Sequence, residues 1–186
     1  AIGGVGLIKD YKKMLTMDFK NNGNIVLVIG KTEGHIDQSL LARLILDEKN
    51  GPPPEVNLFN EKNNGETLLD LIEKDYVKSA HDVSLGGIIT AISKMCIKGG
   101  KGIELKIPKY LINEIEYFFS EDQGRYIIEV TSGDLKNVTK ILDKNSVHYD
   151  EIGKIIDKNM IINQKTKVTI DELKSYNTNW LKNYMV

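Results

Sequence analysis

Residues 77–95, VKSAHDVSLGGIITAISKM, decide the fold class because they join a predicted strand directly to a predicted helix. The segment 77–82 has the pattern of a strand, and apolar residues then recur at helical spacing from 85 to 98. Gly99 and Gly100 follow, and glycine commonly ends a helix. We therefore expect the strand to deliver His81 and Asp82 to an edge of the sheet, beside the start of the helix.

The same alternation continues on both sides of this stretch. Residues 25–31, IVLVIGK, form an apolar run bounded by turn residues, which is typical of a buried central strand. Further strands are predicted at 102–107, 125–131, 147–156, 160–163 and 167–170. Helices are predicted after Asp37 or Ser39 as far as Gly51, and at 61–76, 110–118, 134–145 and 171–183. Because several late strands are hairpin-like, the pattern predicts a mixed β-sheet with packed helices, of the α+β or layered α/β class.

We expect one domain over residues 1–186, with an irregular lead-in at 1–24 and a less diagnostic tail at 157–186. The helix at 61–76 is expected to pack through Leu68, Leu69, Ile72 and Tyr76, and the last helix through Leu173, Trp180, Leu181 and Tyr184. The chain opens AIGGVGLI without Met, so we expect it to be a piece of a longer chain.

Composition excludes several classes of protein. Hydrophobic residues make up 41% and charged residues 27%, unlike collagen-like, disulfide-rich or disordered chains. Lys and Arg number 25 against 26 Asp and Glu, so the positive excess typical of nucleic-acid binding is missing. No signal peptide is visible and the apolar runs are too short to span a membrane. We expect a cytoplasmic protein with neither nucleic acid nor membrane as a partner.

Cysteine and histidine suggest no reactive centre. The single cysteine, Cys96, lies in an apolar helical pattern and is interpreted as a buried packing residue. His35, His81 and His148 form no metal-binding pattern such as HExxH.

The first polar stretch of interest is residues 79–87, SAHDVSLGG, at the strand-to-helix junction. The N–H groups at a helix N-terminus favour an anion, and glycines allow a ligand to approach the backbone closely. The alternative is that Asp82 or Ser84 merely caps the helix while the glycines pack it against the sheet.

The second stretch is residues 120–126, SEDQGRY, which precedes a buried strand. Glu121, Asp122 and Gln123 suit a hydroxyl, an ammonium or a magnesium-bound phosphate, and Arg125 is one of only two arginines. The alternative is a solvated turn with Arg125 in a salt bridge at a strand edge.

The third stretch is residues 30–39, GKTEGHIDQS, which follows the first core strand. A glycine-containing loop with hydroxyl groups can cradle an oxyanion, although the Walker A pattern is absent. A plain loop ending in a serine cap is the alternative.

These stretches, in this order, resemble the C-terminal domain of the aminoimidazole ribonucleotide synthetase superfamily. The resemblance is closest to the phosphoribosylformylglycinamidine synthase family, large-subunit type. It is carried by IGGVGLI at 2–8, VIGKTEGHIDQSLL at 28–41, NGPPPEV at 50–56, NNGETLLDLI at 63–72, AHDVSLGGIITAISKM at 80–95 and FSEDQGRYIIEV at 119–130.

The resemblance implies a role in purine biosynthesis. In that family's reaction ATP, with magnesium, activates the amide oxygen of formylglycinamide ribonucleotide by phosphorylation, and glutamine-derived ammonia displaces it to give the amidine. It also implies that this chain is about the last quarter of the subunit and is inactive alone. Its implied partners are the remaining domains of the subunit, a glutaminase and a small subunit.

The resemblance further implies an auxiliary nucleotide- or phosphate-facing site, and no catalytic residue or certain metal ligand. Its expected residues are Asp82, Ser84, Gly86, Gly87, Glu121, Gln123 and Arg125, with Gln38 and Ser39 as weaker candidates. Leu85 and Asp37 depart from the family pattern, which usually has Asp and Gly there. Two alternatives stay open: another superfamily member, such as an aminoimidazole ribonucleotide or selenophosphate synthetase, or a non-catalytic assembly module.

Overall fold

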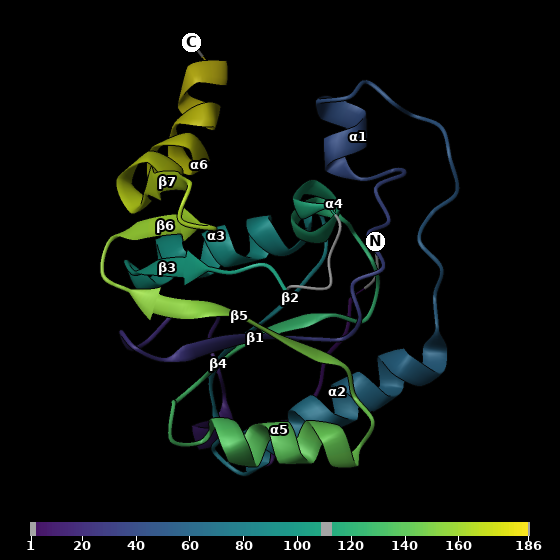
Figure 1. Ribbon diagram of the computed structural model, residues 1–186, viewed down its shortest axis with the longest axis vertical. Coiled ribbons are helices and arrows are strands. Elements are labelled where there is room, and N and C mark those ends of the chain that lie inside the picture. The colour runs from purple at the N-terminus through teal and green to yellow at the C-terminus, as the bar shows by residue number, and fades with distance from the viewer. Residues whose placement is uncertain (1–2, 109–112, 186) are drawn as a thin grey trace.

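The computed structural model describes residues 3–108 and 113–185, and its centre is one seven-stranded sheet (Figure 1). The strands are β1 (Ile25–Ile29), β2 (Val77–Asp82), β3 (Gly102–Leu105), β4 (Tyr126–Val130), β5 (Tyr149–Ile156), β6 (Asn159–Ile162) and β7 (Thr166–Thr169). Their order across the sheet is β2-β4-β1-β5-β3-β6-β7, in which only β3 and β6 are parallel neighbours. The predicted mixed sheet with packed helices is confirmed.

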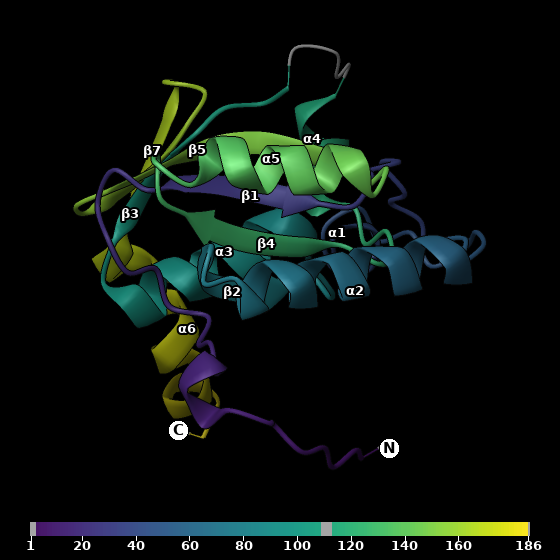
Figure 2. The same ribbon diagram turned by 90° about the horizontal axis from the view of Figure 1, so that it is seen from below.

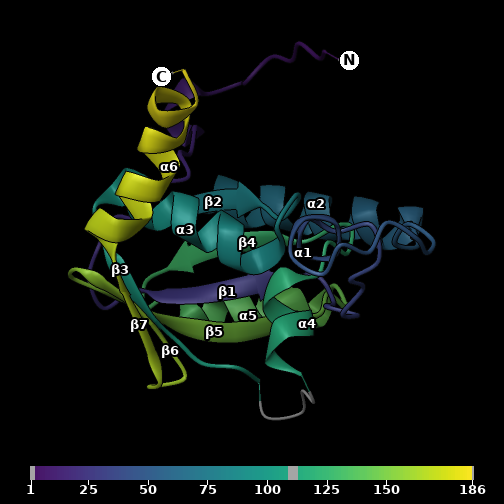
Figure 3. The same ribbon diagram turned by 90° about the horizontal axis from the view of Figure 1, so that it is seen from above.

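Helices cover both faces of the sheet. They are α1 (Leu40–Leu44), α2 (Leu58–Glu73), α3 (Gly87–Gly99), α4 (Glu114–Phe119), α5 (Leu135–Lys144) and α6 (Ile170–Tyr184), with a 3-10 turn at Tyr11–Lys13. Helices α2 and α5 lie on one face (Figure 2), and α3 and α4 on the other (Figure 3). No helix in the described part of the chain is long and apolar enough to cross a membrane.

The central strand β1 is buried on both faces, which explains its continuous apolar sequence. Val26 and Val28 belong to the core beneath α3 and α4, whereas Leu27 and Ile29 belong to the core beneath α2 and α5. Successive side chains of a strand point to opposite faces, so a strand between two helical layers must be apolar throughout.

Several predicted boundaries are wrong. The helix after Ser39 ends at Leu44 instead of continuing to Gly51. Helix α2 begins at Leu58 because the Asn57 side chain accepts the N–H of Asn60. On that helix Leu69 is exposed, and Leu71 is buried in its place. Residues 110–112, the start of the predicted helix at 110–118, lie outside the described residues.

The packing predicted for the last helix is also wrong within this chain, apart from Leu173. Leu173 contacts the core on the α3 side, but Trp180, Leu181 and Tyr184 are 63%, 49% and 82% exposed. Helix α6 leaves the body of the domain after its first turn, and no other part of residues 3–108 and 113–185 covers these three side chains (Figure 1).

Candidate functional site

Glu121, in the polar stretch 120–126, contacts the stretch 79–87 and the residue that directly follows the stretch 30–39. More than thirty residues of sequence separate it from each contact. Its Oε1 accepts the N–H of Leu40 and the N–H of Gly86, each at 2.8 Å. A single carboxylate therefore fastens the start of α1 and the turn before α3 to the segment that leads into β4.

Asp122 fastens the loop that follows β1. This carboxylate is 5% exposed; its Oδ2 accepts the N–H groups of Glu33 and Gly34 at 3.0 and 3.1 Å, and its Oδ1 that of His35 at 3.1 Å. Hydrogen bonds to an ionised acceptor are stronger than neutral ones, so this clamp sets the path of the loop.

The Arg125 guanidinium is buried and bonded to protein oxygens. It donates to the carbonyl of Asp122 at 3.1 Å, the Thr32 hydroxyl at 3.0 Å and the carbonyl of Ser120 at 2.7 Å. Burial lowers the pKa of the Arg125 guanidinium, and the Asp122 carboxylate opposes part of that shift. Arg125 therefore holds the turn together. The salt bridge in the alternative interpretation is present, since Nη1 of Arg125 lies 3.7 Å from Oδ2 of Asp122, but both side chains are buried and not solvated.

The glycines shape the turn before α3. Gly86 and Gly87 have φ angles of +82° and +68°, a region that favours glycine. Gly86 is the N-cap, with no side-chain cap bond, so the interpretation that Asp82 or Ser84 caps this helix is wrong. The Gly86 N–H donates a hydrogen bond to the Glu121 carboxylate, and the Gly87 N–H donates to the Ser84 carbonyl at 3.0 Å. Neither of these two N–H groups is left for an anion in this structure.

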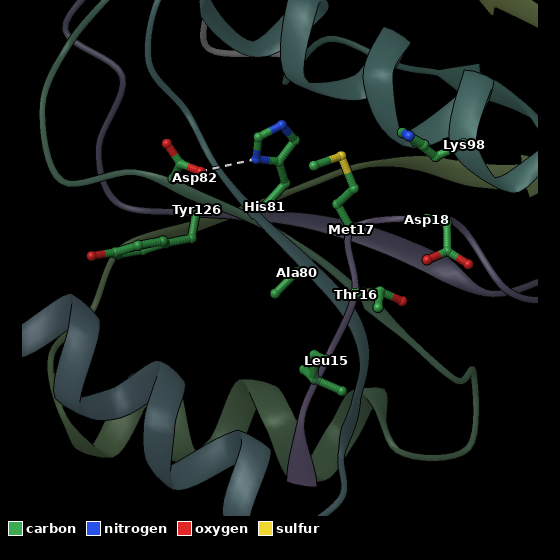
Figure 4. A pocket seen from close by; sticks show the side chains of 9 residues that line it. All are labelled: Leu15, Thr16, Met17, Asp18, Ala80, His81, Asp82, Lys98 and Tyr126. Carbon is green, nitrogen blue, oxygen red and sulfur yellow. Dashed lines mark hydrogen bonds and ion pairs between the residues drawn. The ribbon is translucent and has the colours of Figure 1, made fainter. Parts of the chain in front are cut away.

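An open groove of about 630 Å³ follows the outer edge of β2 (Figure 4). We call it the β2-edge groove. It is lined by Leu15, Thr16, Met17, Asp18, Ala80, His81, Asp82, Lys98 and Tyr126. Of the predicted site residues only Asp82 lines it, with its side chain 66% exposed.

His81 and Tyr126 line the groove beside Asp82. His81 Nδ1 lies 3.0 Å from Asp82 Oδ1, whereas the buried Nε2 has no hydrogen-bond partner among the described residues. Burial raises the pKa of the Tyr126 hydroxyl, and the nearby Glu61 and Asp82 carboxylates raise it further. The quoted sequence motifs contained His81 and Tyr126, but neither motif nor periodicity offered a signal for residues 15–18.

A second, polar cleft of about 550 Å³ lies between the loop after β1 and the start of α2. It is lined by Gly30, Lys31, Glu33, His35, Glu55, Asn57, Asn60, Glu61, Asn64, Asp122, Gln123, Gly124, Ser146 and His148. Of the residues expected at the nucleotide-facing site Gln123 lies here, together with Asp122 of the same polar stretch and with Gly30, Lys31, Glu33 and His35 of the 30–39 stretch. The asparagines of α2 were missed because only the fold brings them to residues 122–124, where Asn64 donates to the Gly124 carbonyl at 2.9 Å.

Gln38 and Ser39 have local structural roles. The Gln38 amide donates to the carbonyls of Lys49 and Gly51 at 2.9 and 3.1 Å. The Ser39 hydroxyl caps α1 by accepting the N–H of Ala42 at 3.1 Å. Of the two residues predicted to start this helix, Asp37 and Ser39, Ser39 is therefore the cap.

Comparison with known proteins assigns this arrangement to a family. A family model described as AIR synthase related protein, C-terminal domain, matches residues 21–163. The chain belongs to this family. The matched region contains every predicted site residue and the Glu121–Asp122 clamp.

Relatives of this AIR synthase related domain are much longer. The chain is 70% identical over 185 residues to phosphoribosylformylglycinamidine synthase subunit PurL of Pelagibacter ubique. The match covers 100% of this chain and 25% of that protein. It therefore spans about a quarter of the length of that relative.

Solved structures share the fold. T. maritima PurL complexed with FGAR superposes with a TM-score of 0.72 at 18% identity, over 88% of this chain and 30% of that one. T. maritima PurL complexed with ATP gives 0.68 at 17% identity, over 88% of this chain and 27% of that one.

The described side chains of this domain offer no ready-made metal site. Within the described ranges no group of three or more His, Cys, Asp or Glu side chains is placed to hold a metal ion. Mg²⁺ is often held by one or two carboxylates together with phosphate oxygens of a nucleotide. The exposed Asp82 carboxylate offers one such oxygen atom.

Proposed function

We propose that this domain is the last quarter of a phosphoribosylformylglycinamidine synthase subunit and serves its ATP-dependent reaction in the cytoplasm. The observation that supports the proposal is the 70% identity to the P. ubique subunit over the whole chain. In the reaction, ATP phosphorylates the amide oxygen of formylglycinamide ribonucleotide. Ammonia from glutamine then displaces phosphate and leaves the amidine.

In this proposal the domain supplies no catalytic residue. The rest of the subunit, a glutaminase and a small subunit are its partners, and the isolated chain is inactive. The domain would instead line an auxiliary site for a nucleotide that carries Mg²⁺.

The β2-edge groove and the turn that follows it would form this domain's side of that site. Asp82 and Ser84 are exposed and would face phosphate or the accompanying ion. Gly86 and Gly87 would shape the turn, while Glu121 and Arg125 would hold it through the contacts described above. Gln123, Gln38 and Ser39 lie further along the same fastened loops and would contribute less.

The test replaces the matching quarter of the P. ubique subunit with residues 1–186. With glutaminase and small subunit added, we expect the chimera to form the amidine from formylglycinamide ribonucleotide, glutamine and ATP. The isolated chain should give none. Turnover by the isolated chain, or a folded chimera without activity, would contradict the proposal.

Asp82→Asn tests the auxiliary site in the same chimera. We expect at least tenfold weaker binding of a non-hydrolysable ATP analogue with Mg²⁺ at that site, because the substitution removes a carboxylate ligand. Asp157→Asn, at an exposed turn between β5 and β6, is the matched control and should bind normally. Equal binding by both variants would leave the domain as an assembly module.

A further inference from the structure

Helix α6 begins in the core and then leaves it. Ile170 is buried and Leu173 packs on the core beneath α3, but every residue from 174 to 185 is exposed. Figures 1 and 3 show the C-terminal part of the helix projecting away from the sheet. Most of the helix is therefore left exposed to solvent by the part of the chain that the structure describes.

The projecting part carries an apolar stripe. Tyr176, Trp180 and Tyr184 follow Leu173 at spacings of three, four and four residues, which places them on one face of the helix. They are 82%, 63% and 82% exposed, and Leu181 flanks them at 49%. We call Tyr176, Trp180, Leu181 and Tyr184 the α6 stripe; it continues the face that Leu173 buries.

The composition around the stripe is that of an interface. The segment SYNTNWLKNY, residues 175–184, contains one charged residue, Lys182. A solvated surface usually carries about a quarter to a third charged residues. Depletion of charge with enrichment in Tyr and Trp marks the buried centre of protein–protein contacts.

The helix also lacks the means to stand alone. Its first turn is secured by a capping box between Thr169 and Glu172. Beyond that turn the sequence is rich in Asn, Ser, Thr, Tyr and Trp, which are weaker helix formers than Ala, Leu or Glu. Isolated helices of this length are marginal in water, and most helical stability in proteins comes from packing. A packing partner for the stripe is therefore required.

We propose that the α6 stripe is buried against another domain of the same longer polypeptide. This proposal rests on the proposed function, in which the domain is one quarter of a subunit. The P. ubique relative aligns over the whole of this chain, α6 included, and three quarters of its length lies outside the match. Covalent linkage holds such a partner at a high effective concentration, so the polypeptide itself fits best as the occupant.

Hydrogen–deuterium exchange tests the proposal in the isolated chain and in the chimera. We expect amides 174–184 to exchange at least tenfold more slowly in the chimera, with β1 and β4 equally protected in both. Trp180→Ser with Tyr184→Ser should abolish that protection. Lys182→Ser, on the opposite face of α6, should preserve it.

Two results would overturn the proposal. One is fast exchange at 174–184 in a chimera whose β1 and β4 are protected. The other is protection of amides 174–184 in the isolated chain that rises with protein concentration. It would come with a blue shift of the fluorescence emission of Trp180, the chain's only tryptophan, and with a doubled mass of the isolated chain in solution. The occupant would then be a second copy.

Separate readouts keep this proposal apart from the proposed function. If the chimera does not fold, the matching helix of the unaltered P. ubique subunit is measured instead, and fast exchange there also overturns the proposal. Slow exchange at 174–184 without amidine formation would refute the proposed activity and support the interface.

Discussion

At the scale of single residues, buried carboxylates hold segments that no strand pairing reaches. Asp122 fixes the loop after β1, and Glu129 fixes the segment before it. Glu129 is fully buried and accepts the backbone N–H groups of Lys20 and Asn21, the Asn24 amide and the Ser79 hydroxyl, at 2.7 to 3.1 Å. A buried charge is tolerated when its acceptor positions are met in this way.

Glu129→Gln should destabilise the domain by roughly 2–4 kcal/mol, because the new amide group turns N–H donors toward existing donors. Urea denaturation measures the change in the free energy of unfolding. Glu151→Gln, on the exposed side of β5, is the control and should change it by less than roughly 0.5 kcal/mol. Equal stability of both variants would show that the Glu129 charge is not needed.

Cys96 should make stability fall at alkaline pH. Burial raises the pKa of its thiol to about 12, from an ordinary value of 9.0, so the folded state keeps the thiol protonated. The stabilising contribution is complete below pH 9 and is lost as pH rises from 9 to 12, with a slope of up to about 1.4 kcal/mol per pH unit. Urea denaturation at pH 8 to 10.5 measures this slope.

Cys96→Ala provides the reference for that measurement. Lys and Tyr residues titrate in the same range in both proteins, so only the difference between the two slopes reports on the thiol. Identical slopes would contradict the predicted burial, as would rapid reaction of the native thiol with a disulfide reagent at pH 8.

At the scale of elements, the start of α3 depends on a close approach that only glycine permits. A Cβ atom on Gly87 would lie 2.5 Å from the carbonyl oxygen of Ser120 and 2.6 Å from that of Phe118. The neighbours are backbone atoms, which cannot rotate away as a side chain can. Gly87 therefore serves packing between α3 and the 118–120 segment, in addition to the turn itself.

Gly87→Ala should cost roughly 3–5 kcal/mol, because it combines a left-handed φ with a backbone clash. Gly100→Ala is the matched control, since Gly100 has a φ of +61° but nothing within 4 Å of the added Cβ. We expect a loss of about 1 kcal/mol there. Thermal unfolding compares the two, and equal losses would mean that the close approach carries no energetic weight.

At the scale of the whole molecule, the two helical layers share their strands and should unfold together. Ile127 and Ile128 are neighbours on β4, both fully buried, yet they belong to opposite cores. Because a central strand is common to both cores, neither layer can lose its packing alone.

Ile127→Ala and Ile128→Ala should each remove roughly 2–5 kcal/mol. Each variant should show a single transition, with the same midpoint by far-ultraviolet circular dichroism and by near-ultraviolet tyrosine signals. Two separated transitions in either variant would show that the layers are independent.

Local sequence determined the elements of this domain. Whether a segment forms a strand or a helix follows from its apolar periodicity and from the glycine and proline residues that end it. These signals act over a few residues, and so the strands at 25–29, 77–82 and 126–130 were predictable. The predicted burial of Cys96 followed from the same periodicity. Motif resemblance also sufficed to suggest the family.

Only the tertiary structure decided strand order, the shape of the site and what remains uncovered. Glu121, Asp122 and Arg125 form a polar run in the sequence, and folding brings Leu40 and Gly86 to Glu121 across 81 and 35 residues. Helix α6 has the amphipathic stripe of a packed helix, but periodicity cannot say where the partner surface lies. Local pattern sets what each segment can form, whereas long-range contacts set what it meets.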